Sequence, residues 1–227
     1  SDVCSSDLKG QIDDFNTYHE NILEWIKIAN EYKIPTFVLG VGLGGLIILN
    51  LLEKTELPIE GILLFSPMLE LKRDYKGCKN KLISNVGKIS KDTRFKVGIT
   101  PQDLTRNDEI IEETANDGLM LKKVTYSWYN LINEKMKETM DHIRDIKPIS
   151  ALIMYGTNDK ILETQSINEM KDKLKSKEMY FKVWDGLYHE IHNEPERDLV
   201  MRYVLSFLNN SVNTMGFIVN EEEIEDI

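Results

Sequence analysis

The sequence has little cysteine, no long apolar segment and a deficit of basic residues. Its two cysteines, Cys4 and Cys78, lack the spacing of a metal site or a disulfide framework, so we expect a reducing, cytoplasmic setting. The most apolar stretch, residues 39–52, contains four glycines and an asparagine and is too short to span a bilayer. The chain does not open with a basic segment followed by an apolar one, so no signal peptide is predicted. These features argue against a disulfide-rich protein and against an integral membrane segment.

Acidic residues outnumber basic ones over the 227 residues. The 38 Asp and Glu against 28 Lys and Arg give a formal charge of −10. A surface this negative repels phosphate backbones, so we expect no nucleic acid among the partners. Five acids lie within residues 221–226, so half of the excess belongs to a predicted solvated tail, residues 210–227. The remaining composition is that of an ordinary globular protein.

The first eight residues read SDVCSSDL and match the in-frame translation of a common sequencing adaptor. We therefore exclude residues 1–8 from the predicted fold. Cys78 is then the one cysteine of the natural sequence. An adaptor joined at Lys9 also predicts that the natural chain began further upstream.

The order of apolar segments predicts an α/β protein. Short apolar runs typical of buried parallel strands lie at residues 36–39, 61–65, 151–155 and 179–183. Helical patterns lie at residues 12–32, 46–53, 164–174 and 196–208. Strands alternating with helices predict a parallel sheet covered on both faces.

A polar stretch interrupts this alternation. Residues 72–144 contain no strong strand, and helical patterns lie at residues 103–116 and 119–140. This composition predicts a helical insertion over the sheet. We therefore divide the chain into a first core part at residues 9–69, a cap at residues 70–145 and a second core part at residues 146–209.

The glycine cluster GVGLGG, residues 40–45, lies between a predicted strand and a predicted helix. It matches the dinucleotide fingerprint G-x-G-x-x-G, but no acid that could hold a ribose occurs before Glu70, so a dinucleotide-binding protein is a remote alternative. The second interpretation is a nucleophile elbow, G-x-S-x-G, with Gly42 at the serine position. Glycine suits the strained conformation of such a turn, so the elbow can form without presenting a hydroxyl.

Two downstream residues favour the elbow. Asp159 follows one predicted strand, and His189 lies in the loop after the next strand. The order elbow, acid, histidine is that of α/β-hydrolases, and the carboxyl ends of parallel strands gather such residues at one edge. His189 would act as general base, and Asp159 would fix its tautomer. The sequence therefore predicts catalytic positions at Gly42, Asp159 and His189.

Ordinary structural roles compete with these assignments. Asp159 could instead cap a helix, and His189 could be a partly buried histidine. His192 is expected on the surface or beside the site, while Glu190 and Glu194 are expected to hold the loop or cap the closing helix. A metal site from His189, His192 and Glu194 lacks the H-E-x-x-H spacing, so we expect no metal and no cofactor.

The chain resembles the bacterial monoacylglycerol lipases and lysophospholipases of the α/β-hydrolase superfamily. The resemblance covers residues 9–208 and rests on GILLFSP at 61–67, LTRN at 104–107, GTND at 156–159 and GLYHEIHNEP at 186–195. It implies an α/β-hydrolase fold with a helical cap, an acyl-binding site, and a Ser-Asp-His triad that cleaves glycerol esters. Asp159 and His189 carry over, whereas the nucleophile does not.

Two departures from the family pattern bear on activity. The family's elbow usually reads Gly-His-Ser-Met-Gly, and three of these five residues differ here, which indicates natural divergence. The resemblance also implies early strands and a His-Gly loop, part of the oxyanion hole, which the printed sequence lacks. The N–H of Leu43 would remain as one oxyanion donor, and loss of a second typically costs about 100- to 1,000-fold in rate.

The expected function is a carboxylic-ester hydrolase that is inactive as it stands because of Gly42. The alternative is a pseudohydrolase that binds a lipid or a small ester without turnover. Met120, Trp128 and Tyr129 in the insertion would either line an acyl tunnel or pack the cap on the core. Ser66, the nearest other hydroxyl, is expected to have a packing role. Residues 36–39 are predicted to form an exposed apolar edge that promotes aggregation, and the oligomeric state is left open.

Overall fold

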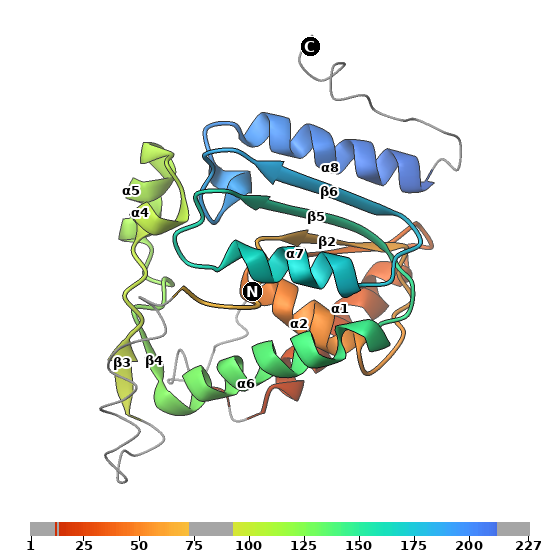
Figure 1. Cartoon of the computed structure of the whole chain (residues 1–227), viewed down its shortest axis with the longest axis horizontal. Helices are drawn as coiled ribbons and strands as arrows, with labels where there is room; N and C mark the ends of the chain where they lie inside the picture. The colour runs from red at the N-terminus through yellow and green to blue at the C-terminus, as the bar shows by residue number, and fades with distance from the viewer. Residues whose placement is uncertain (1–11, 13, 73–92, 213–227) are drawn as a thin grey trace.

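A computed structural model of the chain describes residue 12 and residues 14–72 and 93–212. Its centre is a four-stranded sheet of β1 (Phe37–Val41), β2 (Gly61–Phe65), β5 (Ser150–Gly156) and β6 (Met179–Trp184), in the order β1-β2-β5-β6. All three pairings are parallel, with Leu39 beside Leu63 and Leu63 beside Leu152. The predicted parallel α/β sheet is confirmed, because each expected apolar run forms one of these strands (Figure 1).

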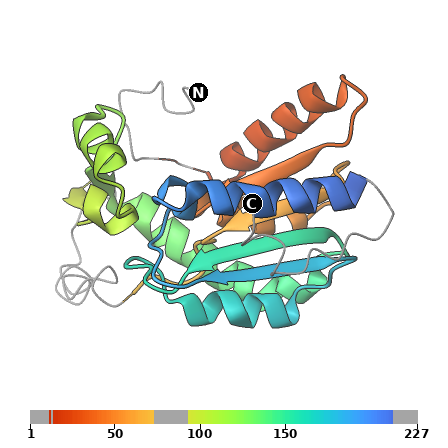
Figure 2. The same cartoon turned by 90° about the horizontal axis from the view of Figure 1, so that it is seen from above.

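Helices cover both faces of the sheet (Figures 1 and 2). Packed on one face are α1 (Asn16–Asn30), α2 (Leu43–Leu52), α6 (Tyr126–His142) and α7 (Thr164–Lys173), and packed on the other is α8 (Arg197–Val212). Side chains of β2 alternate between the two cores, with Ile62 and Leu64 in one and Leu63 and Phe65 in the other. Alternation with all five residues buried is what a central strand covered on both faces requires.

The cap differs from the prediction in two places. The expected helix at 103–116 is divided into α4 (Pro101–Leu104) and α5 (Asp108–Asn116), because the side chain of Asn107 caps α5 by accepting the N–H of Glu109 at 3.1 Å. The expected helix at 119–140 begins only at Tyr126, where the side chain of Thr125 accepts the N–H of Trp128. The residues before it form β4 (Lys123–Thr125), which pairs with β3 (Arg94–Lys96).

The predicted start of the tail differs from the structure, and several predicted features lie outside the described residues. The closing helix α8 continues to Val212, three residues into the predicted tail, and the rest of that tail lies outside the described residues. The described residues also exclude residues 1–8, with Cys4, and Cys78. The predicted division into core and cap remains a prediction.

Strand β1 forms one edge of the described sheet, and α1 lies beside it (Figure 2). The carbonyl of Thr36 and the N–H of Gly42 bond to the segment containing β2. Because backbone direction alternates along a strand, Phe37, Leu39 and Val41 direct their N–H and C=O groups away from β2. The Leu39 side chain is 51% exposed and Trp25 of α1 is 61% exposed. The predicted apolar edge is therefore present in the described part of the chain.

A buried polar cluster joins α2 to the cap helix α6. Asn50, fully buried in the otherwise apolar α2, lies 3.1 Å from Oγ1 of Thr139 and 3.3 Å from Oε2 of Glu53. The other carboxylate oxygen of Glu53, Oε1, has no hydrogen-bond partner among the described residues. Burial, together with the nearby negative charge of Glu138, raises the pKa of Glu53 to about 7.

We expect the charge on Glu53 to oppose folding above neutral pH. The folded state binds the carboxyl proton of Glu53 more tightly than the unfolded chain does. The stabilisation that comes from this protonation is therefore complete below the ordinary pKa of 4.5, and it is lost as the pH rises through about 7. Glu53→Gln should therefore raise the free energy of unfolding by about 1–3 kcal/mol at about pH 8 and change it little at about pH 4.5. Urea unfolding at both pH values measures this, and the exposed Glu60→Gln is the charge-matched control. Equal pH dependence in Glu53→Gln and the parent protein would contradict the assignment.

We also expect the β1 edge to promote self-association. Leu39→Lys places a charge on the open edge and should lower association, because charged side chains disfavour edge-to-edge pairing. Leu205→Lys is the matched control, because Leu205 is 58% exposed on the helix α8, whose backbone offers no open strand for pairing. Sedimentation velocity over a concentration series measures the effect. A monodisperse parent protein, or equal loss of association in both variants, would contradict this role for the edge.

Candidate active site

A sharp turn at Gly42 connects β1 to α2. Gly42 has φ 52° and ψ −115°, a left-handed region that glycine adopts at little cost. Its N–H donates to the carbonyl of Phe65 at 3.0 Å, and its own carbonyl accepts from the N–H of Met68 at 2.9 Å. The turn is thus held by the end of β2, and it has the strand–turn–helix geometry of a nucleophile elbow.

Gly40 allows the strand and the helix to approach closely. A Cβ atom placed on Gly40 would lie 2.6 Å from the carbonyl carbon of Gly44, well inside van der Waals contact. A Cβ on Gly44 would meet no atom within 4 Å. The two glycines that flank Gly42 in the elbow motif therefore have different roles, because packing requires a glycine at position 40 and does not require one at position 44.

Asp159 and His189 form a buried pair beyond the ends of β5 and β6. Oδ2 of Asp159 lies 2.8 Å from Nδ1 of His189, with Asp159 fully buried and His189 95% buried. Oδ1 of Asp159 accepts the backbone N–H groups of Ile161 at 2.8 Å and Leu162 at 2.9 Å. Because a carboxylate only accepts hydrogen bonds, the pair favours the tautomer with the proton on Nδ1, which leaves Nε2 as the basic atom.

Nε2 of His189 is directed at the turn. A Cβ atom placed on Gly42 would lie 3.0 Å from Nε2 and 3.6 Å from Cε1 of His189. The structure therefore brings together all three predicted positions, Gly42, Asp159 and His189. The arrangement offers no side-chain nucleophile at the elbow, and the roles of Asp159 as orienting acid and His189 as general base remain predictions.

Leu43, the expected oxyanion donor, is the first residue of α2. Its N–H is one of the N-terminal donors that have no partner within a helix. This position suits binding of a developing oxyanion, and the assignment remains a prediction.

Ser66 and His192 lie inside the protein near the site. Ser66 is fully buried, has φ 43° and donates its N–H to Met154, while its Oγ has no partner in the described part of the chain. His192 lies against Phe65, with ring centroids 6.0 Å apart, and burial lowers its pKa. The buried setting of Ser66 fits the expected packing role.

The three candidate acyl-binding residues lie in different surroundings. Nε1 of Trp128 donates to the hydroxyl of Tyr18 at 3.1 Å, and the buried ring of Tyr129 packs edge-on against Phe95. Met120 lines a separate cavity of about 320 Å³ within the cap. The structure does not gather these side chains around Gly42, and their role in binding an acyl chain remains a prediction.

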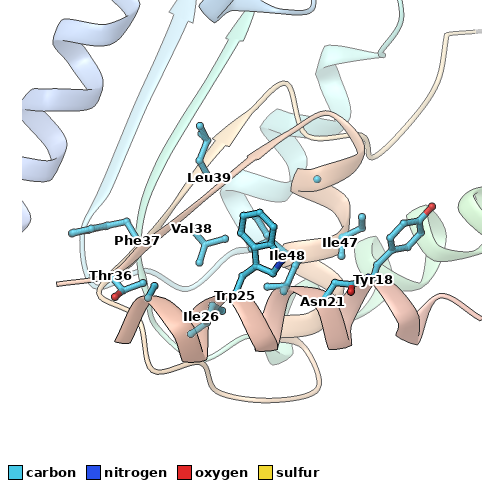
Figure 3. A pocket seen from close by; sticks show the side chains of 13 residues that line it. Tyr18, Asn21, Trp25, Ile26, Thr36, Phe37, Val38, Leu39, Ile47 and Ile48 are labelled. Carbon is cyan, nitrogen blue, oxygen red and sulfur yellow. The ribbon is translucent and has the colours of Figure 1, made fainter. Parts of the chain in front are cut away.

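An apolar cavity of about 490 Å³ lies between α1, β1 and α2 (Figure 3). Trp25, Leu39 and Ile48 contribute to its lining, and it reaches Gly44, two residues beyond Gly42. Sequence reasoning did not identify it, because the amphipathic stripe of α1 indicates a face that packs inward and does not reveal that the packing is incomplete. A large apolar residue on that stripe, Trp25, was the available signal.

Within the described residues, His, Cys, Asp and Glu nowhere gather in a group of three or more that could hold a metal ion. None of the helices in this part of the chain combines the length and apolarity needed to cross a bilayer.

The chain is similar in sequence to a family of hydrolases and to a bacterial phospholipase. The family model described as serine aminopeptidase, S33 (Hydrolase_4) matches residues 4–196. The phospholipase YtpA of Bacillus subtilis is 28% identical over 205 residues, which cover 90% of this chain and 79% of that protein.

Solved structures share the fold. The monoacylglycerol lipase of Paleococcus ferrophilus superposes with a TM-score of 0.70 at 23% identity, over 85% of this chain and 75% of that one. A soluble variant of the Saccharomyces cerevisiae monoglyceride lipase, in complex with a substrate analogue, gives a TM-score of 0.78 at 18% identity, over 90% of this chain and 72% of that one. These likenesses confirm the predicted α/β-hydrolase fold.

The two glycines provide a test of the turn. We expect Gly40→Ala to lower the free energy of unfolding by about 1–3 kcal/mol, because the new methyl group overpacks the strand–helix contact. Gly44→Ala should raise it by about 0.4–1 kcal/mol, because the helical position is open and alanine restricts the unfolded chain. Thermal and urea unfolding of both variants measure the difference. Equal effects of the two substitutions would contradict the described turn.

Proposed function

Because this chain belongs to the Hydrolase_4 family of α/β-hydrolases, we propose that it is a lipase-like protein that binds a fatty-acyl ester without turning it over. One observation carries the proposal. Gly42 occupies the elbow, and a Cβ atom placed on it would lie 3.0 Å from Nε2 of His189. Glycine has no hydroxyl that could attack an ester. In serine proteases, loss of the nucleophile costs on the order of 10⁶-fold in rate.

The ligand class is inferred from the site and from its relatives. A relative named as a phospholipase and a structural neighbour named as a monoglyceride lipase both act, by name, on lipid esters. The apolar cavity that reaches Gly44 suits an alkyl chain.

The intact acid–histidine pair favours a second candidate function, which is slow hydrolysis. His189 remains oriented by Asp159, so it could activate a water molecule in the space above Gly42. Such a protein would release fatty acid slowly from a bound ester. Turnover by the Gly42 protein therefore separates the two functions.

Restoring the nucleophile tests the proposal. In Gly42→Ser, Nε2 of His189 would take the proton from the serine hydroxyl, and the oxygen would attack the ester to give an acyl-enzyme. We expect Gly42→Ser to hydrolyse short acyl esters and to react with a fluorophosphonate probe, and the Gly42 protein to do neither. We also expect the substitution to cost about 1–3 kcal/mol of stability, because φ is positive at this position.

Gly42→Ala is the matched control, because it carries the same backbone strain and no hydroxyl. Gly42→Ser combined with His189→Gln tests the base. Comparable hydrolysis by the Gly42 protein and Gly42→Ser would contradict the proposal and support the second candidate. Failure of a folded Gly42→Ser to react would show that the elbow or the oxyanion site is incomplete.

A further inference from the structure

We propose that the cap positions His189 through an ion pair between Arg106 and the buried carboxylate of Glu194. The inference concerns the assembly of the acid–histidine pair, so it holds whether or not the protein binds an ester. Arg106 of the cap and Glu194 of the histidine loop would then be positioning residues, and neither has a role in the predicted chemistry at Gly42.

Glu194 is the centre of this contact. Its carboxylate is fully buried, and Oε1 accepts the backbone N–H of Tyr188, the residue before His189, at 2.6 Å. Oε2 accepts from Nε of Arg106 at 2.9 Å and from the backbone N–H of Arg106 at 3.2 Å. A buried carboxylate needs such partners, because an unpaired buried charge is costly. The loop conformation that presents His189 therefore depends on a cation supplied by the cap.

Two further bonds join the same segments. The N–H of Glu190 donates to the carbonyl of Leu104 at 2.8 Å, and the hydroxyl of Thr105 donates to the carbonyl of Asn193 at 2.9 Å. Together with the Arg106–Glu194 ion pair, these bonds connect residues 104–106 to the histidine loop, both before and after His189. The histidine loop is thus held along its length by one short cap segment.

The cap also contacts the loop that carries Asp159. The Lys72 ammonium donates to the carbonyl of Asp159, and the Lys72 N–H donates to the carbonyl of Ile161 at 2.8 Å. The Lys160 ammonium donates to the carbonyl of Gln102 at 3.1 Å and lies 4.0 Å from the ring centroid of Tyr188. Both catalytic loops therefore meet the cap at the carboxyl ends of the strands, where α4 and α5 lie (Figure 1).

Arg106 suits this role because its guanidinium can make separate contacts in one plane. Nε bonds the buried Glu194, while Nη2 pairs with Glu196, whose side chain is 39% exposed. A lysine retains the charge but cannot reproduce both contacts. Displacement of a catalytic group by about 1 Å can cost on the order of 100-fold in rate, so loosening of this loop should be measurable as lost reactivity.

Three substitutions in the full chain test the inference. Glu194→Gln and Arg106→Lys weaken the buried contact, and Glu196→Gln is the matched control that removes only the outer partner of the same arginine. The first measurement is the proton NMR signal of the His189 Nδ1–H in the Gly42 protein, identified by its loss in His189→Gln. The second is the fluorophosphonate labelling rate in the Gly42→Ser background, measured well below each variant's Tm.

We expect Glu194→Gln and Arg106→Lys to broaden or abolish the His189 signal and to lower the labelling rate by about 10- to 100-fold. Glu196→Gln should leave both within about twofold of the parent. Unchanged signals and rates in the first two variants, or an equal loss in Glu196→Gln, would overturn the proposal. If Gly42→Ser is not labelled at all, the elbow or the oxyanion site is incomplete, and the NMR signal in the Gly42 protein still decides the positioning role. Thr105→Val, which removes one hydroxyl, supplies the test if a charge variant does not fold, and it should also weaken the signal.

Discussion

Nε2 of His189 lies 3.0 Å from the point where a side chain on Gly42 would begin, and three separate parts of the chain must fold together to produce that distance. The β1–α2 connection supplies the turn, the loop after β5 supplies Asp159, and the loop after β6 supplies His189. Parallel strands make this convergence possible, because their carboxyl ends lie at one edge of the sheet. Lys72 and residues 102–106 form hydrogen bonds to the two loops, so contacts outside the sheet also hold the site.

With glycine at position 42, the elbow turn forms but carries no nucleophile. The backbone at Gly42 adopts a conformation that strains any other residue, and glycine removes that strain together with the nucleophile. The two fully buried carboxylates, Asp159 and Glu194, nevertheless keep their full sets of donors. Both carboxylates are therefore hydrogen-bonded although they are buried, and Asp159 bonds directly to His189.

The strands and the three site positions could be predicted from the sequence, because apolar runs mark buried strands and the order of Gly42, Asp159 and His189 fixes their edge of the sheet. The strands β3 and β4 could not be predicted, because each has three residues and contains basic side chains. The division at Asn107 had a local signal, a capping residue followed by acids, which the helical periodicity obscured. The Arg106–Glu194 pair had no such signal, because a contact between residues 88 positions apart leaves no local pattern. The cavity had one local signal, the large apolar residue Trp25 on the stripe of α1, but periodicity does not show that the packing there is incomplete.

We propose that this protein binds an acyl ester at the site around Gly42 and leaves it intact. The most direct test is to incubate the unaltered protein with a monoacylglycerol, separate the bound fraction, and quantify both intact ester and released fatty acid. We expect saturable binding with the ester recovered whole, and loss of binding when a bulky residue at position 38, in place of Val38, fills the cavity. Release of fatty acid in proportion to protein and time, abolished by His189→Gln, would contradict it, and so would the absence of saturable binding.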